Sequence, residues 1–151
     1  MNAQLGLSNV WLAAGSLGRA RREADHFLAS ALSTGEPNLH ALGWDVRARV
    51  SIAEKDWEAA DEAIERGLAV TQRFTIPTVA WRLHATRSEL CRRSKNDETA
   101  EVHRRRAETI ILSLAESFEP DEPLRRTFLT ARPVRKILAP RPPGRSVRER
   151  R

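Results

Sequence analysis

Residues 39–70 have the sequence LHALGWDVRARVSIAEKDWEAADEAIERGLAV, and this stretch decides the fold. Its first half carries two apolar stripes at helical spacing on opposite sides, so this helix must be covered on both sides. Its second half carries one broad stripe, so that helix is covered on one side only. The break Lys55-Asp56, with Asp56 as N-cap, joins the two as an antiparallel hairpin. The first helix's stripes are Leu39, Leu42, Val46, Val50 and Ala53 on one side, and Ala41, Trp44, Ala48 and Ile52 on the other.

The same two-helix pattern recurs before and after this stretch. Trp11, Trp44 and Trp81 align at offsets of about 33 and about 37 residues, within the range of helical repeats. No segment alternates apolar and polar residues in the way that a half-buried strand does. Two-helix units that recur at roughly 33 to 40 residues indicate an all-α solenoid. The second helices give a similar spacing, because Ala24, Ala60 and Ala100 align at offsets of about 36 and about 40 residues.

Each unit resembles a tetratricopeptide repeat, a pattern that pairs a Trp and a small residue on the first helix with small residues on the second. Trp44 and Ala48 fit the first-helix positions, and Ala60 and Gly67 fit the second. The resemblance covers about residues 5–118. It implies an all-α, tetratricopeptide-like α-solenoid of about three helical hairpins with a C-terminal capping helix. The first helices of such an array line its concave side.

The chain is expected to divide into three parts. Residues 1–118 form the helical repeats, residues 119–138 form C-terminal capping helices, and residues 139–151 form a disordered basic Pro/Arg tail. Residues 121–134 are similar to the C-terminal end of tetratricopeptide arrays in large bacterial signalling ATPases and regulators. We therefore expect this chain to be the C-terminal repeat portion of such a regulator.

The two ends of the array are expected to differ in how their outermost helices are covered. Leu124 and Phe128, on a short helix over residues 121–131 with Asp121 as N-cap, are predicted to seal the last hairpin. The first helix has no repeat before it to cover its outer stripe, and terminal repeats normally have polar outer faces. An exposed apolar edge is therefore predicted at Leu5, Leu7, Val10 and Leu12.

The net charge of +6 over 151 residues is located almost entirely at one end. From Arg132 onward the charge is +7, which leaves −1 for the rest of the chain. A nearly neutral body has no field to hold a polyanion, so nucleic-acid binding through the Arg-rich tail is the alternative function. No apolar run approaches the length of a membrane helix and no signal peptide is visible, so we expect a cytoplasmic protein with no membrane partner.

No pattern predicts catalysis. The glycines lack the spacing of a phosphate loop, so no cofactor is expected. His84, Cys91 and His103 contain no closely spaced ligand pair, so no metal site is expected either. Cys91, the single cysteine, is expected to be a small core side chain rather than a nucleophile. The four tryptophans are expected to pack in the core at their helical positions rather than to stack on bases.

Four charged residues are the candidate binding residues. Asp45, Arg49, Arg82 and Glu89 are predicted to project onto the concave side, judged from their angular positions relative to the tryptophans and from the groove positions that the resemblance implies. The predicted function is a non-catalytic protein–protein interaction scaffold. Its partner is a protein, a peptide, or a neighbouring domain of a larger bacterial signalling or transcriptional regulator.

Overall fold

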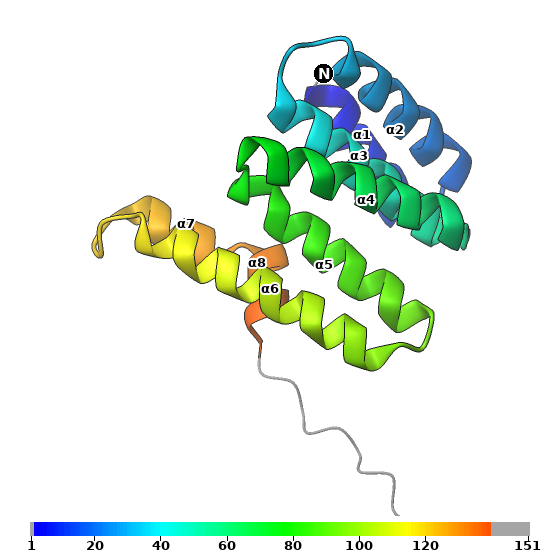
Figure 1. Ribbon diagram of the computed structural model, residues 1–151. Coiled ribbons are helices and arrows are strands. Elements are labelled where there is room, and N and C mark those ends of the chain that lie inside the picture. Colours follow the sequence, from blue (N-terminus) through cyan, green and yellow to red (C-terminus); the bar gives the residue numbers. More distant parts are fainter. Residues whose placement is uncertain (1, 140–151) are drawn as a thin grey trace, which may run out of the picture.

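The computed structural model describes residues 2–139, with side chains from Leu5 onward, as eight helices without a strand (Figure 1). The all-α class predicted from the sequence is confirmed. The first six helices pair as three antiparallel hairpins, and two short helices follow. Within these residues no helix is both long and apolar enough to cross a bilayer. The helices are α1 (Asn2–Ala13), α2 (Leu17–Leu32), α3 (Pro37–Glu54), α4 (Trp57–Phe74), α5 (Pro77–Arg93), α6 (Asp97–Glu116), α7 (Pro123–Thr130) and α8 (Arg132–Leu138).

The three hairpins repeat at an even spacing. The second helices begin at Leu17, Trp57 and Asp97, and both α3 and α5 begin at a proline. This period of about 40 residues exceeds the roughly 34 residues of a typical tetratricopeptide repeat. Each hairpin turn has a left-handed residue, and the N–H of the N-cap that follows donates to the carbonyl five residues earlier. The left-handed residues are Gly15 (φ 72°), Lys55 (φ 62°) and Lys95 (φ 58°), and the N-caps are Ser16, Asp56 and Asn96.

This period corrects the alignment that the tryptophans predicted. The tryptophan offsets are wrong, because Trp44 is equivalent to His84 and Trp81 to Ala41. The indoles fill different gaps: Trp44 packs with the core between α3, α4 and α5, whereas Trp81 packs against α6 and α8. The alanine offset between the second and third units is right. The equivalent alanines are Ala20, Ala60 and Ala100, all fully buried, and Ala24 does not belong to this set.

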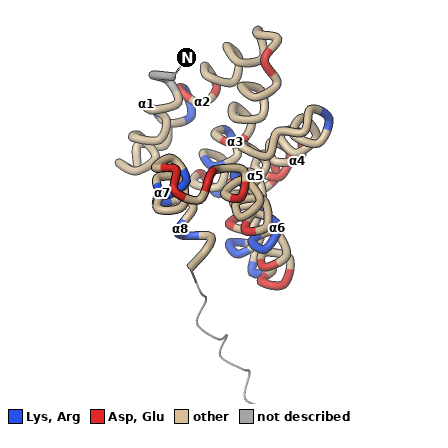
Figure 2. Tube along the Cα trace, turned by 90° about the vertical axis from the view of Figure 1, so that its left-hand side faces the viewer, with Lys and Arg blue, Asp and Glu red and all other residues tan. Residues whose placement is uncertain are grey.

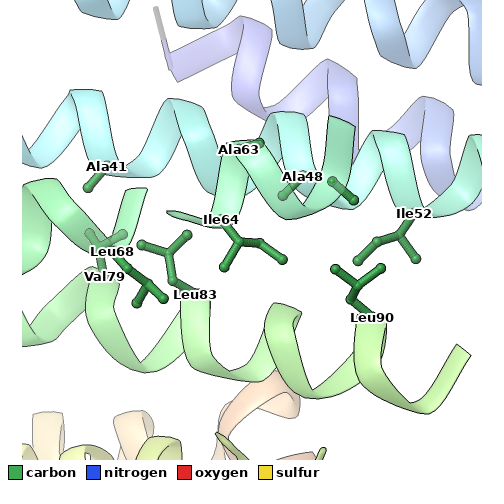
Figure 3. Close-up of a cluster of buried hydrophobic side chains, with 10 residues drawn as sticks. Ala41, Ala48, Ile52, Ala63, Ile64, Leu68, Val79, Leu83 and Leu90 are labelled. Carbon is green, nitrogen blue, oxygen red and sulfur yellow. The ribbon is translucent and has the colours of Figure 1, made fainter. Parts of the chain in front are cut away.

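Helix α3 is buried on two sides, as its two stripes predict. Val46 and Val50 pack on one side in a cluster with residues of α2. Ile52 packs on the other side, and Figure 3 shows it facing Leu90 of α5. Ala53 belongs to the first predicted stripe but is exposed, in the last turn of α3. The predicted N-cap Asp56 is confirmed, since its Oδ1 accepts a hydrogen bond from the Ala59 N–H at 3.1 Å.

The four tryptophans differ in burial. Trp81 is buried, and Trp11 and Trp44 are half-buried. The guanidinium of Arg66 lies 5.1 Å from the Trp44 ring centroid and covers its outer side. Trp57 is 38% exposed, so its predicted core role is wrong. It is the first residue of α4.

An ion pair recurs where one hairpin meets the next. Arg47 Nε lies 2.8 Å from Asp25, and Arg87 Nη2 lies 2.7 Å from Glu65. The two arginines occupy equivalent positions in consecutive hairpins, and so do the two acids. Each pair joins the first helix of one hairpin to the second helix of the previous hairpin. Because both carboxylates are exposed, each pair contributes at most about 1 kcal/mol. These pairs therefore fix the register of stacking more than they add stability.

Helices α7 and α8 cover the end of the third hairpin. Val134 and Ile137 of α8 are buried in a cluster with Trp81 of α5 and residues of α6 (Figure 1). The sequence analysis placed capping helices within residues 119–138 and gave bounds only for the first of them, residues 121–131. The chain turns at Ala131, which is extended, and Pro133 in the first turn of α8 starts a new helix there.

Details of the predicted capping helix need correction. Its N-cap is Glu122 and not Asp121, because Pro123 takes the first helical position. Phe128 does seal the third hairpin, with its ring centroid 6.1 Å from that of Phe118. Leu124 does not, since it is 60% exposed. The predicted disordered tail, residues 139–151, lies outside the described residues apart from Ala139.

Two of the four residues predicted to form an exposed apolar edge on the first helix are exposed. Leu7 and Val10 are exposed on α1. Leu5 and Leu12 instead pack against the buried cluster formed with α2 and α3. A stripe of about 100° on one side of α1 therefore remains without a neighbour among the described residues.

Candidate interaction groove

A concave site lies between α1 and α8, over α3 and α5. Figure 2 shows α1 and α8 on one side of α3 and α5, with α4 and α6 on the other. The site has a volume of about 560 Å³ and is lined by side chains of these four helices. We call it the concave groove. Leu12, Ala53 and Pro133 are at least partly exposed and contribute to its apolar surface, from three different helices.

The structure brings all four predicted binding residues into this groove. Asp45 and Arg49 come from α3, and Arg82 and Glu89 come from α5. They meet because α3 and α5 are first helices of adjacent hairpins and pack directly against each other. That they bind a partner stays a prediction.

Asp45 is the least accessible of the four, with 2% of its surface exposed. The Thr86 hydroxyl donates to its Oδ1 at 2.6 Å, and Arg49 Nε lies 3.3 Å from its Oδ2. Thr86 and Arg49 each contact one oxygen of the Asp45 carboxylate, and Thr86 lies on a different helix, α5. Asp45 therefore joins α3 to α5 beneath the groove rather than presenting a free charge.

Arg82 and Glu89 carry charge at the groove surface. Arg82 lies over the Trp81 ring, 4.7 Å from its centroid. Desolvation lowers the pKa of Arg82 from its usual value while Asp45 acts to raise it, and a guanidinium is cationic at neutral pH. Desolvation acts to raise the pKa of Glu89, but the hydrogen bond from Arg93, 2.8 Å long, and the surrounding cations lower it overall. Glu89 is therefore an anion at neutral pH.

Sequence reasoning missed the part of the groove that α8 supplies. Pro133, Lys136 and Ile137 line it, and Figure 2 shows basic positions on α8. Lys136 had been counted only in the charge of the C-terminal region. The three-residue spacing of Val134 and Ile137 is a helical signal that would have placed Lys136 on a docked helix.

His84 and His103 are brought together outside the groove. Their Nδ1 atoms lie 3.0 Å apart, and their rings stack with centroids 5.2 Å apart at 25°. They meet because α5 and α6 are antiparallel, in the register that also lets the Ser88 hydroxyl donate to the Ala100 carbonyl. The sequence analysis considered these histidines together with Cys91 only as a metal set, and the hairpin register is the signal that pairs them.

The pair has lowered basicity. Burial, followed by His103, Arg106 and Arg87, lowers the pKa of His84 from 6.5 to about 4. Burial, followed by Arg87 and Arg106, also lowers the pKa of His103, while Glu65 acts to raise it. One Nδ1 donates and the other accepts only if at least one ring is neutral. The pair is therefore a neutral hydrogen bond between α5 and α6 at pH 7.

Stability is expected to fall as this pair is protonated. The unfolded chain takes up the His84 proton near pH 6.5, and the folded chain takes it up only near pH 4. The contribution of the neutral pair to the free energy of unfolding is therefore complete above about pH 6.5 and is lost as the pH falls towards 4. After allowance for partial exposure, the loss of unfolding free energy is about 1 to 2 kcal/mol. Urea unfolding at pH 7.5 and 4.5 measures it. His84→Asn should have a flatter pH dependence, and an unchanged slope would contradict the assignment.

Cys91 is the one cysteine of the chain. Burial raises the pKa of the Cys91 thiol, so it is protonated and a poor nucleophile at neutral pH. Cys91 is half-buried, and its predicted place in the core is only partly right. Among the residues that the structure describes, no three His, Cys, Asp or Glu side chains are placed to hold a metal ion.

The concave groove thus combines apolar surface with fixed charges on packed helices. Comparison with protein-family models, with curated proteins and with solved structures gives no match for this chain. The tetratricopeptide resemblance therefore stays a prediction, and the groove is interpreted from its own geometry.

Proposed function

We propose that this chain is a non-catalytic protein-interaction scaffold that binds an extended peptide segment of a partner in the concave groove. The observation that carries the proposal is a site of about 560 Å³ enclosed by four helices. Its walls belong to packed hairpins with buried cores, so little conformational entropy is lost from the scaffold on binding. Apolar surface from Leu12, Ala53 and Pro133 offers contact area, and charges beside it offer specificity.

The proposal includes a place within a larger bacterial signalling or transcriptional regulator. The exposed Leu7 and Val10 on α1 support it, because solenoid hairpins stack through such apolar stripes. A neighbouring hairpin or domain of the same regulator would cover this stripe. The partner segment in the groove is then a second, separate contact.

The groove is tested by filling it without changing charge. Ala53 is exposed and lines the groove, so Ala53→Trp places an indole there, whereas Ala69→Trp adds the same indole on the exposed side of α4. A displayed library of random dodecapeptides is selected on the full chain. Selected peptides should bind Ala53→Trp roughly tenfold or more weakly than the original chain, because burying an indole there removes the contact area.

The matched variant is the control for any general effect of a surface tryptophan. Ala69→Trp should bind the selected peptides as tightly as the original chain does, measured by fluorescence anisotropy. Equal binding to both tryptophan variants, or a library with no enriched peptide, would overturn the proposed function.

A further inference from the structure

We propose that the segment held in the concave groove is acidic, with carboxylates that contact Arg82, Arg92 and Lys136. This inference rests on the proposed function and names the chemistry of its ligand. It is carried by the charges of the groove, by the donors that the fold leaves without acceptors, and by the apolar surface between them.

The groove is positively charged although the described body is nearly balanced. Five basic side chains line it against two carboxylates, a net charge of +3. Both carboxylates are already engaged, Asp45 by Thr86 and Arg49, and Glu89 by Arg93. The groove therefore has an excess of positive charge that its own carboxylates do not neutralise. The five basic residues are Arg49, Arg82, Arg92, Arg93 and Lys136.

Three of these cations have no carboxylate within ion-pair distance in the described part of the chain, and Asp45 acts on Arg82, and Glu89 on Arg92 and Lys136, only from farther away. Arg82 contacts the Trp81 ring and forms no ion pair, and Lys136 forms none either. Arg92 donates through Nη2 to the Ser88 hydroxyl at 3.1 Å, while its buried Nε has no acceptor. A buried donor without an acceptor costs about 1 to 3 kcal/mol. A bound carboxylate would supply the missing acceptor.

A second guanidinium is incompletely satisfied on the other side of the groove. Arg49 Nε lies 3.3 Å from the Asp45 carboxylate, yet it is buried and makes no well-aligned hydrogen bond. Donors on α3 and on α5 thus both lack acceptors at the groove. Charge-assisted hydrogen bonds to carboxylates are the strong interactions that such groups form.

The apolar surface favours a peptide over other polyanions. Ala53 and Pro133 are exposed on α3 and α8, so side chains between two carboxylates of a ligand would contact hydrocarbon. A phosphodiester backbone has no group that fits such a surface.

The chain's own residues 141–151 carry five arginines and one glutamate. Their net charge is positive, like that of the groove, so repulsion excludes this segment as its occupant.

The test compares charge reversal inside and outside the groove. Arg82→Glu with Lys136→Glu reverses two free groove charges. Arg22→Glu with Arg126→Glu changes net charge equally at exposed positions on α2 and α7. The library selection is performed on the full chain, and the selected peptides are measured by anisotropy against both double variants. Circular dichroism checks that both variants fold.

Peptides selected on the original chain should carry a net negative charge. Their affinity should fall roughly tenfold or more for the groove variant and by less than about threefold for the control. Peptides without an acidic excess that still lose affinity with Ala53→Trp would overturn this inference and leave the proposed function standing. Equal losses in both double variants would overturn it too, as would an oligothymidylate of the same length that displaces the peptides.

Discussion

Replacing Leu83 with alanine is expected to lower the free energy of unfolding by about 3 kcal/mol or more. Leu83 is fully buried, and Figure 3 shows it pointing from α5 towards Ile64 and Leu68 of α4. The loss combines the hydrophobic contribution of the side chain with the cavity left behind. Urea unfolding followed by circular dichroism measures it. Val102→Ala, on the exposed side of α6, is the control and should change stability by less than about 0.5 kcal/mol.

Substitution of Gly67 provides a second test of the packing around Leu83. A Cβ at Gly67 would lie 2.7 Å from Leu83 Cδ2 and 3.2 Å from Trp44 Cβ. Gly67→Ala should therefore destabilise the original chain by crowding, although alanine favours a helix by about 1 kcal/mol over glycine. In the Leu83→Ala background the crowding is relieved, and the same substitution should stabilise. An effect of equal sign and size in both backgrounds would show that Leu83 is not what requires glycine here.

Asp45→Ala is expected to have the second largest effect, a loss of about 2 to 3 kcal/mol. The substitution leaves the Thr86 hydroxyl without its acceptor and Arg49 without its counter-ion, both between packed helices. Asp45→Asn keeps an oxygen for Thr86 and should lose less. Urea unfolding of both variants provides the measurement.

An exposed carboxylate provides the comparison. Asp25 pairs with Arg47 at the junction of α2 and α3 and is half exposed to solvent, so Asp25→Ala should cost less than about 1 kcal/mol. If Asp45→Ala costs no more than Asp25→Ala, then Asp45 does not join α3 to α5 and its burial has another cause.

Local signals were enough to predict the hairpins. The break at Lys55-Asp56 combines a residue that adopts the left-handed conformation with a side chain that caps α4, and both functions depend only on neighbouring residues. The two stripes of α3 likewise follow from its own sequence, because a helix with apolar residues on opposite sides needs two neighbours. The all-α class rests on these features.

Tertiary packing decides what local signals missed. The position of a tryptophan in a repeat depends on where the neighbouring helices leave space for an indole. Trp44 and Trp81 therefore do not mark equivalent sites. The contact between His84 and His103 and the entry of α8 into the groove depend on how separate helices meet. For the groove, angular position predicted the side on which Asp45 and Arg82 lie, but not that Asp45 is already engaged by Thr86.

The ion pairs between hairpins also make the chain modular. In a tandem duplication of residues 37–76, the second copy of Arg47 would meet Glu65 of the first copy in the way that Arg47 meets Asp25. The second copy of Glu65 would in turn face Arg87. The one new junction would find its counter-ion already encoded, so the reach of the scaffold can grow by whole hairpins without new side chains at the seams.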